Sequence, residues 1–159
     1  MDRAPHRRTV LVAHPSPDLY GSDRVALASV EALAAHGWRV VATVPHGGPL
    51  VGPLREAGAD VVVCPTPVLR RAALRPGGLL RLLVTTVGSV VPGVLLLRRH
   101  RPDAVYVSTL TAPLWLLLAR ASGRPVVCHL HEAEAEAGRP RLVQRALAAP
   151  LLASTAVIA

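Results

Sequence analysis

Short apolar runs that alternate with longer helical stretches are the feature that most constrains the fold of this 159-residue chain. Each run is rich in valine and other apolar residues, a composition typical of strands that are buried on both faces of a sheet. The expected strands are Thr9–Ala13, Arg39–Val44, Asp60–Cys64, Asp103–Val107, Pro125–Leu130 and Ala156–Ala159. Strands that alternate with helices indicate right-handed βαβ units. The pattern therefore predicts a Rossmann-like α/β fold, a doubly wound parallel sheet with strand order 3-2-1-4-5-6.

Helices are expected between these runs, and the first of them has recognisable ends. The expected helices are Asp23–His36, Leu50–Ala57, Ala112–Ala121 and Arg139–Ala153. In the first helix Ala26, Val30 and Leu33 form one apolar stripe, Ser22 is suited to be the N-cap, and Gly37 is suited to end the helix. Because domains usually contain about 100–150 residues, we expect a single domain over residues 1–159.

One apolar segment, Leu79–Leu97, raises the question of a membrane. A membrane span needs about 20 predominantly apolar residues. Arg81 interrupts the start of the segment, and Pro92 lies inside it. We expect a buried crossover helix that is kinked near Pro92, since the segment lies between two strands of one sheet. The alternatives are a helix that lies in the membrane surface, with the arginines at its end facing anionic headgroups, and a true span.

Charge and cysteine usage exclude several classes of partner and compartment. The chain has 18 basic and 10 acidic residues, which gives a formal net charge of +8. We expect no nucleic-acid partner, because the chain has only two tryptophans and two tyrosines and no DNA- or RNA-reading motif. Cys64 and Cys128 lie far apart without metal-binding spacing, so buried thiols in a reducing compartment are expected. The N-terminus lacks an apolar segment long enough for a signal peptide, and we expect no secretion.

The loop His14–Arg24, which follows the first expected strand, is the main candidate for a ligand site. In open α/β sheets, ligands bind at the carboxyl ends of the strands where the strand order reverses. Gly21 permits close approach of a ligand to the backbone, and the N–H groups that follow can hold a phosphate or a hydroxyl group. The GxGxxG and GxxxxGK[ST] motifs are absent, which argues against an NAD-dependent oxidoreductase and an NTPase. A plain turn with a helix cap is the alternative.

Several short motifs occur along the chain in a recognisable order. They are YGSDR (20–24), GPL (48–50), LREAGAD (54–60), RRHRPDAVYVST (98–109), VCHLHE (127–132) and STAVIA (154–159). With this order of motifs the chain resembles the N-terminal, acceptor-side domain of a family 4 glycosyltransferase with the GT-B architecture. The resemblance covers nearly the whole chain, although each motif is modest by itself.

The resemblance implies where the functional residues lie, but it identifies no catalytic residue. Gly21 and Ser22 would lie at the interdomain cleft, near the phosphates of the donor and the acceptor. His131 and Glu132 would face the same cleft and position the acceptor hydroxyl or the transferred sugar, since both side chains hydrogen-bond to hydroxyl groups. His14, at the tip of the first strand, would point into this region. A hydrogen-bonded turn residue at His14 and a packed or solvated strand end at His131 are the structural alternatives.

The implied reaction is transfer of a hexose, with retention of configuration, from a nucleotide-diphosphate sugar to a carbohydrate or lipid-linked acceptor, as in polysaccharide biosynthesis. No metal ion or cofactor is required. The family's second, nucleotide-sugar-binding domain has no counterpart in this sequence, so we expect the chain to be incomplete alone, with a C-terminal catalytic half on another chain as one arrangement. A cytoplasmic location is expected, either free or peripheral at the inner face of an anionic membrane. The alternatives are a non-catalytic α/β ligand-binding module and a membrane-associated partner subunit of a two-chain transferase.

Overall fold

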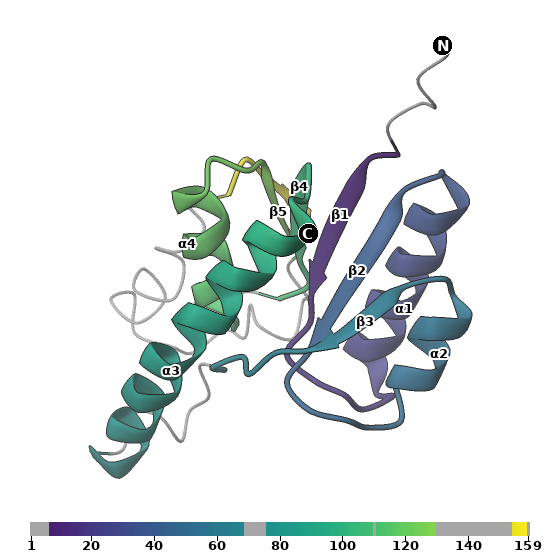
Figure 1. Cartoon of the computed structure of the whole chain (residues 1–159). Coiled ribbons are helices and arrows are strands. Elements are labelled where there is room, and N and C mark those ends of the chain that lie inside the picture. Colours follow the sequence, from purple (N-terminus) through teal and green to yellow (C-terminus); the bar gives the residue numbers. More distant parts are fainter. Residues whose placement is uncertain (1–6, 69–75, 110, 130–153, 159) are drawn as a thin grey trace.

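The computed structural model describes residues 7–68, 76–109, 111–129 and 154–158. Within these residues, six parallel strands form one sheet in the order β3-β2-β1-β4-β5-β6 (Figure 1). The strands are β1 (Thr9–Ala13), β2 (Arg39–Val44), β3 (Asp60–Val63), β4 (Ala104–Val107), β5 (Val126–His129) and β6 (Ala156–Ile158). The predicted α/β class and strand order are therefore confirmed.

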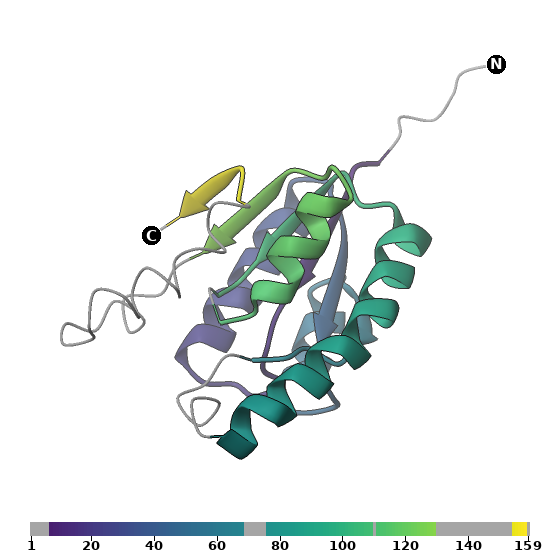
Figure 2. The same cartoon turned by 90° about the vertical axis from the view of Figure 1, so that its left-hand side faces the viewer.

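Helices cover both faces of this sheet (Figures 1 and 2). The described helices are α1 (Gly21–Ala35), α2 (Val51–Glu56), α3 (Pro76–His100) and α4 (Pro113–Ala121). Successive residues of β1 point to opposite faces, so Val10 and Val12 pack with α1 and α2, whereas Leu11 and Ala13 pack with α3 and α4. The helix predicted over Arg139–Ala153 lies outside the described residues. Both cysteines are buried, as predicted.

The start of α1 differs from the prediction. The helix begins at Gly21, and its N-cap is Tyr20 rather than Ser22. The carboxylate of Asp23, at the third helical position, accepts a hydrogen bond from the backbone N–H of Tyr20 at an N···O distance of 2.8 Å. The prediction of Ser22 as the N-cap was wrong because this carboxylate binds the N-cap backbone from inside the first turn. The predicted stop is confirmed, since Gly37 has a φ of 83°.

The prediction of a buried crossover helix over Leu79–Leu97 was only half correct. α3 does connect β3 to β4, but only 17% of its most apolar window is buried. Contact with the protein is concentrated near the C-terminal end, where Leu96 and Leu97 are buried. There a Cβ on Gly93 would lie 2.6 Å from a methyl carbon of Leu118, so a glycine allows α4 to approach α3 closely. The sequence did not reveal the exposure of α3 because an apolar helix facing the core and one facing outward have similar compositions.

Candidate functional site

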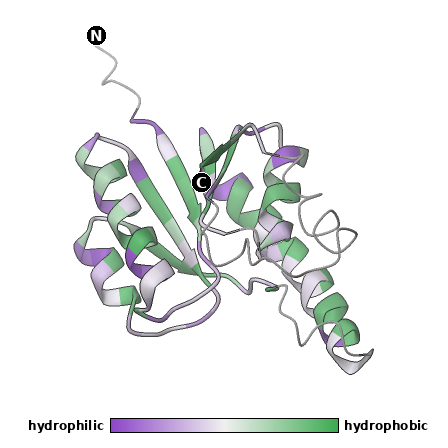
Figure 3. Cartoon of the chain, turned by 180° about the vertical axis from the view of Figure 1, so that it is seen from behind, coloured by the Kyte–Doolittle hydropathy of each residue, from purple (hydrophilic) through white to green (hydrophobic). Residues whose placement is uncertain are grey.

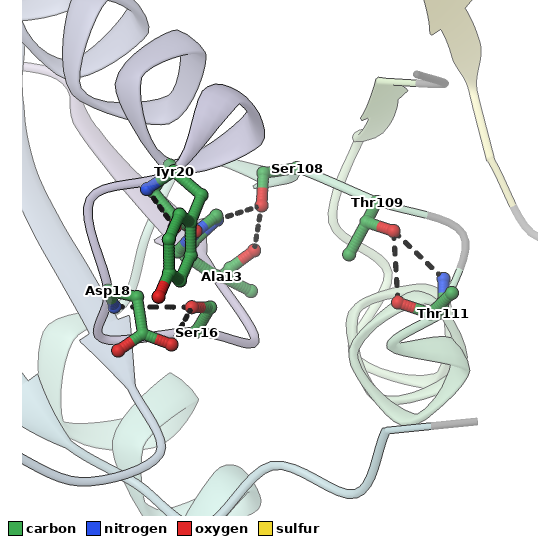
Figure 4. Close-up of polar contacts among 9 residues, drawn as sticks. Ala13, Ser16, Asp18, Tyr20, Ser108, Thr109 and Thr111 are labelled. Carbon is green, nitrogen blue, oxygen red and sulfur yellow. Dashed lines mark hydrogen bonds and ion pairs between the residues drawn. The ribbon is translucent and has the colours of Figure 1, made fainter. Parts of the chain in front are cut away.

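The carboxyl ends of β1 and β4 lie side by side at the point where the strand order reverses. From β1 the chain builds the sheet outward to β2 and β3, and from β4 it builds the other half through β5 to β6. The loops after β1 and β4 therefore diverge and leave a crevice between them, which is where open parallel sheets bind their ligands. The predicted site loop leaves β1 here, and Ser108 and Thr109 follow β4 at the same edge (Figure 4).

Three buried polar side chains connect these two strand ends. The ring of His14 lies between Ser108 and Asp23: its Nδ1 is 2.6 Å from Ser108 Oγ, and its Nε2 is 2.7 Å from Asp23 Oδ1. Each of the three residues is at most 2% exposed. Because Asp23 also accepts the N–H of Tyr20, this network joins β1, β4 and the first turn of α1.

One arrangement of protons that fits these distances places a proton on both ring nitrogens of His14. Ser108 Oγ lies 2.6 Å from His14 Nδ1 and 3.2 Å from the carbonyl oxygen of Ala13, and its hydroxyl has one proton to donate. In the protonated state Nδ1–H donates to Ser108, the Ser108 hydroxyl donates to Ala13, and Nε2–H donates to Asp23. His14 and Asp23 then form a buried ion pair.

The carboxyl group of Asp23 is expected to make the domain sensitive to acid. Burial raises its pKa, but the hydrogen bonds from His14 and from the N–H of Tyr20, together with the charge of His14, outweigh burial and hold the pKa below its ordinary value. The unfolded-state pKa is about 3.9, so this stabilisation is complete above that value and is lost as the pH falls through the lower folded-state pKa. Urea unfolding measured from about pH 6 down to pH 2 should show the loss. An Asp23→Asn variant should lose less stability over that range, and an equal loss in both proteins would contradict the assignment.

The predicted site residues occupy different depths at this edge. Gly21 and Ser22 are exposed at the N-terminus of α1, and a Cβ on Gly21 would meet no atom within 4 Å. His14 lies at the predicted end of β1, but its ring is buried beneath the loop rather than pointing into the cleft, because Asp23 and Ser108 hold its two nitrogens. His131 and Glu132 lie outside the described residues, and their role stays a prediction.

A cavity of about 720 Å³ opens at the same edge of the sheet. Its walls are the loops that follow β1, β2 and β3, together with the N-terminal half of α3. The polar lining residues are Ser16, Asp18, His46, Thr66, Arg81 and Thr85, and the prolines are Pro15, Pro17, Pro45, Pro65 and Pro67. Proline restricts the backbone, so these walls are stiff, and the polar groups offer donors and acceptors of the kind that sugar hydroxyls bind. The sequence analysis missed this cavity because only the sheet topology brings its loops together.

The GPL motif has a packing role at this cavity. A Cβ on Gly48 would lie 2.7 Å from both the Cβ and the carbonyl oxygen of Pro17, so any larger residue would push the loops apart. The N–H of Leu50 donates to that carbonyl oxygen at 2.8 Å, and the Leu50 side chain is buried. The loops after β1 and β2 are therefore packed as one unit, which forms one wall of the cavity.

A second polar group joins β4, β5 and α1 on the same face of the sheet as the His14 network. Tyr106 Oη is 2.6 Å from His129 Nδ1 and 3.2 Å from Ser29 Oγ. Burial raises the pKa of the Tyr106 hydroxyl, which therefore stays neutral and can serve these partners. In the part of the chain that the structure describes, no three potential metal ligands come together.

The six-stranded parallel sheet, its switch point and the cavity at the carboxyl edge are the features of a Rossmann-like domain of the GT-B glycosyltransferase type. A family model described as "Glycosyl transferase 4-like domain" matches residues 20–158. The chain belongs to this family, which confirms the resemblance seen in its motifs. A comparison with curated protein sequences finds no significant match.

Solved glycosyltransferase structures share the fold of the chain. MurG from Acinetobacter baumannii aligns with a TM-score of 0.65 and 18% identity, over 94% of this chain and 40% of MurG. Anabaena HepE, solved in complex with UDP and glucose, aligns with a TM-score of 0.62 and 17% identity, over 94% of this chain and 37% of HepE. SsfS6 from Streptomyces sp. SF2575 aligns with a TM-score of 0.55 and 17% identity, over 91% of this chain and 44% of SsfS6. The chain thus spans less than half the length of each of these proteins.

Proposed function

We propose that this domain supplies the acceptor-binding half of a glycosyltransferase that transfers a hexose from a nucleotide-diphosphate sugar to a carbohydrate or lipid-linked acceptor. The observation that carries the proposal is a cavity with sugar-binding chemistry at the carboxyl edge of a glycosyl transferase 4-like domain. The donor-binding half belongs either to the same polypeptide or to a partner chain. The reaction takes place in the cytoplasm, where nucleotide sugars serve as donors, and it needs no metal ion or cofactor from this domain.

In this proposal the N-terminus of α1 faces the phosphates of the donor. The first N–H groups of a helix lack partners within it and lie at the positive end of its dipole, so they bind anions. The open space around Gly21 lets a phosphate approach the backbone, and the exposed hydroxyl of Ser22 adds a donor. These N–H groups stabilise the charge that develops on the departing diphosphate. The buried pair of His14 and Asp23 holds this turn in place.

The cavity receives the acceptor. Asp18 can accept hydrogen bonds from two sugar hydroxyls, while Arg81 can bind the pyrophosphate of a lipid-linked acceptor. His131 and Glu132 are assigned, through the family resemblance, to positioning the acceptor hydroxyl or the transferred sugar. Both groups of residues would act from the acceptor side of the cleft, with the donor held opposite them.

Replacing Gly21 with valine tests this arrangement. In the complete transferase, Gly21→Val should lower hexosyl transfer by about 10- to 100-fold, because the side chain blocks approach to the backbone N–H groups. The melting temperature should stay unchanged, since the new side chain meets no protein atom nearby. Transfer is measured from radiolabelled UDP-glucose and GDP-mannose to soluble oligosaccharides and to polyprenyl-pyrophosphate-linked sugars.

A glycine at the start of another helix provides the matched control. Gly77, at the second position of α3, is also exposed, and a Cβ on it would likewise meet no atom within 4 Å. Gly77→Val should keep full transfer to soluble acceptors, and His131→Ala should lower it. Full activity in both Gly21→Val and His131→Ala would overturn the site. Binding of a nucleotide or glycan without transfer from any donor would instead identify a non-catalytic ligand-binding module or a partner subunit.

A further inference from the structure

α3 is apolar along most of its length (Figure 3), and many of its large apolar side chains are exposed rather than packed against the protein. Six leucines and valines, each more than half exposed, follow one another at intervals of one to four residues: Leu80, Leu83, Val84, Val87, Val91 and Leu95. This spacing places them on one side of the helix, and we call them the α3 stripe. At about 1.5 Å per residue the stripe is roughly 22 Å long.

The side of α3 that faces the protein is small and polar along much of its length. Ser89 and Gly93 are buried, and Thr86 is half-buried. The hydroxyls of Thr86 and Ser89 donate to the carbonyl oxygen four residues earlier in the helix, at 2.7 and 2.6 Å. A helix on the surface of a soluble domain has the opposite arrangement, with its apolar side inward. The outward side of α3 is therefore better suited to contact with an apolar environment than to contact with water.

Positive charge lies at the C-terminal end of the stripe. Neither α3 nor α4 contains an acidic residue. Arg98, Arg101 and Arg124 line a groove of about 610 Å³ whose other walls include Leu97 and Leu118. Arg98 comes three residues after Leu95, so it continues the line of the stripe. The α3 stripe is thus followed by a groove that is lined by both apolar side chains and three arginine guanidinium groups.

The connections of α3 exclude a position across a bilayer. By length and composition α3 could span a membrane, and it is the one described helix of which this is true. Its two ends, however, lead to β3 and β4, which belong to one sheet. The helix could cross a bilayer only by carrying the sheet into the hydrocarbon, where the polar groups of the sheet edges would lose their partners. α3 can therefore meet a membrane only by lying along its surface.

We propose that the α3 stripe and the arginines at its end form a docking surface for an anionic lipid membrane. The leucines and valines lie at the boundary between headgroups and acyl chains, and Arg98, Arg101 and Arg124 bind lipid phosphates. A second copy of the chain fits this face less well, because α3 and α4 contain no acidic residue and the same face of another copy would offer the arginines no counter-charge. Lipid phosphates supply the opposite charge.

Docking in this orientation places the candidate acceptor cavity next to the lipid. The N-terminal half of α3 lines that cavity through Gly78, Arg81, Leu82 and Thr85. The membrane surface would therefore adjoin the cavity and give it direct access to a lipid-linked acceptor. This last step rests on the proposed transferase function, whereas membrane docking itself does not.

Flotation of the 159-residue chain with lipid vesicles tests the docking surface. The chain should float with phosphatidylcholine vesicles that contain about 30% phosphatidylglycerol and remain unbound with phosphatidylcholine alone. Val87→Glu, at a position 72% exposed, should lower the partition coefficient at least about tenfold. Arg98→Gln combined with Arg101→Gln should lower it about 30-fold, which is about fivefold for each arginine.

Exposed residues on the opposite face of the sheet provide matched controls. Val25→Glu on α1, and Arg24→Gln combined with Arg55→Gln, make the same changes of charge and should leave binding unchanged. A tryptophan introduced as Val87→Trp should be quenched by lipids with brominated acyl chains, whereas one introduced as Val25→Trp should not. The same vesicles serve for both measurements.

Two results would overturn the proposal. One is a partition coefficient that does not depend on the phosphatidylglycerol content of the vesicles, or that is the same for Val87→Glu as for the unchanged chain. The other is a dimer, measured by light scattering, that Val87→Glu converts to monomers while no form of the chain binds vesicles, which would show that a second copy covers the stripe. Transfer to soluble acceptors does not depend on membrane binding. Measuring that transfer therefore distinguishes a failure of the docking proposal from a failure of the proposed transferase function.

Discussion

Replacing Asp23 with alanine is expected to lower the free energy of unfolding by about 3–5 kcal/mol, because the substitution leaves a buried partner without its counter-charge. Asp23 Oδ1 and His14 Nε2 are 2.7 Å apart, and the two side chains are 2% and 3% exposed. A domain of this size is stabilised by about 5–15 kcal/mol in total, so the loss would be a large fraction. Urea unfolding near neutral pH, followed by circular dichroism, measures it.

The same network explains why the effect should extend to function. Asp23 accepts the N–H of Tyr20, so its removal frees the first turn of α1, where Gly21 and Ser22 are assigned to the donor phosphates. Glu31→Ala, at an exposed position of the same helix, is the control and should change stability by no more than about 0.5 kcal/mol. A loss below about 1 kcal/mol for Asp23→Ala would mean that His14 finds an equally good partner without it.

The sheet could be predicted from the sequence because each strand is specified locally. A run such as TVLVA or DAVYV is apolar throughout, and the right-handed rule for βαβ units then leaves few possible strand orders. Gly37 marked the end of α1 for an equally local reason, namely its positive φ. The start of α1 was predicted less well because the capping carboxylate of Asp23 acts backward along the chain, from a position inside the helix.

The candidate site could be located from the sequence but not assembled. The position of His14 at the end of β1 followed from topology, whereas its pairing with Ser108 joins residues 94 positions apart. The outward orientation of the α3 stripe could not be predicted for a related reason. The hydrophobicity of a side chain indicates that its burial is favourable, but it does not indicate whether the side chain packs against this protein or against something outside it. Polar residues that directly follow a strand, as Ser108 follows β4, are the one signal that could have indicated the network.

Trp115→Ala is expected to lower the free energy of unfolding by about 3–5 kcal/mol, because it leaves a large cavity in the core between the sheet and α4. Trp115 is 1% exposed and is among the largest fully buried side chains of the described residues. Leu117→Ala, on the same helix at a position 56% exposed, is the control and should cost no more than about 0.5 kcal/mol. Thermal unfolding of the three proteins gives the comparison, and similar losses for Trp115→Ala and Leu117→Ala would contradict it.

Trp115 also connects this core to the candidate acceptor cavity, and a milder substitution separates its two roles. Its Nε1–H donates to Thr66 Oγ1 at 3.1 Å, and the Thr66 hydroxyl in turn donates to the carbonyl oxygen of Cys64, also at 3.1 Å. Thr66 lines the cavity, so the indole fixes one of its walls from behind. Trp115→Phe keeps most of the apolar contact but removes the N–H, and should cost only about 1–2 kcal/mol. If the cavity binds the acceptor, this variant should raise the KM for acceptor more than it lowers kcat, whereas a purely structural role for Trp115 would leave both unchanged wherever the protein remains folded.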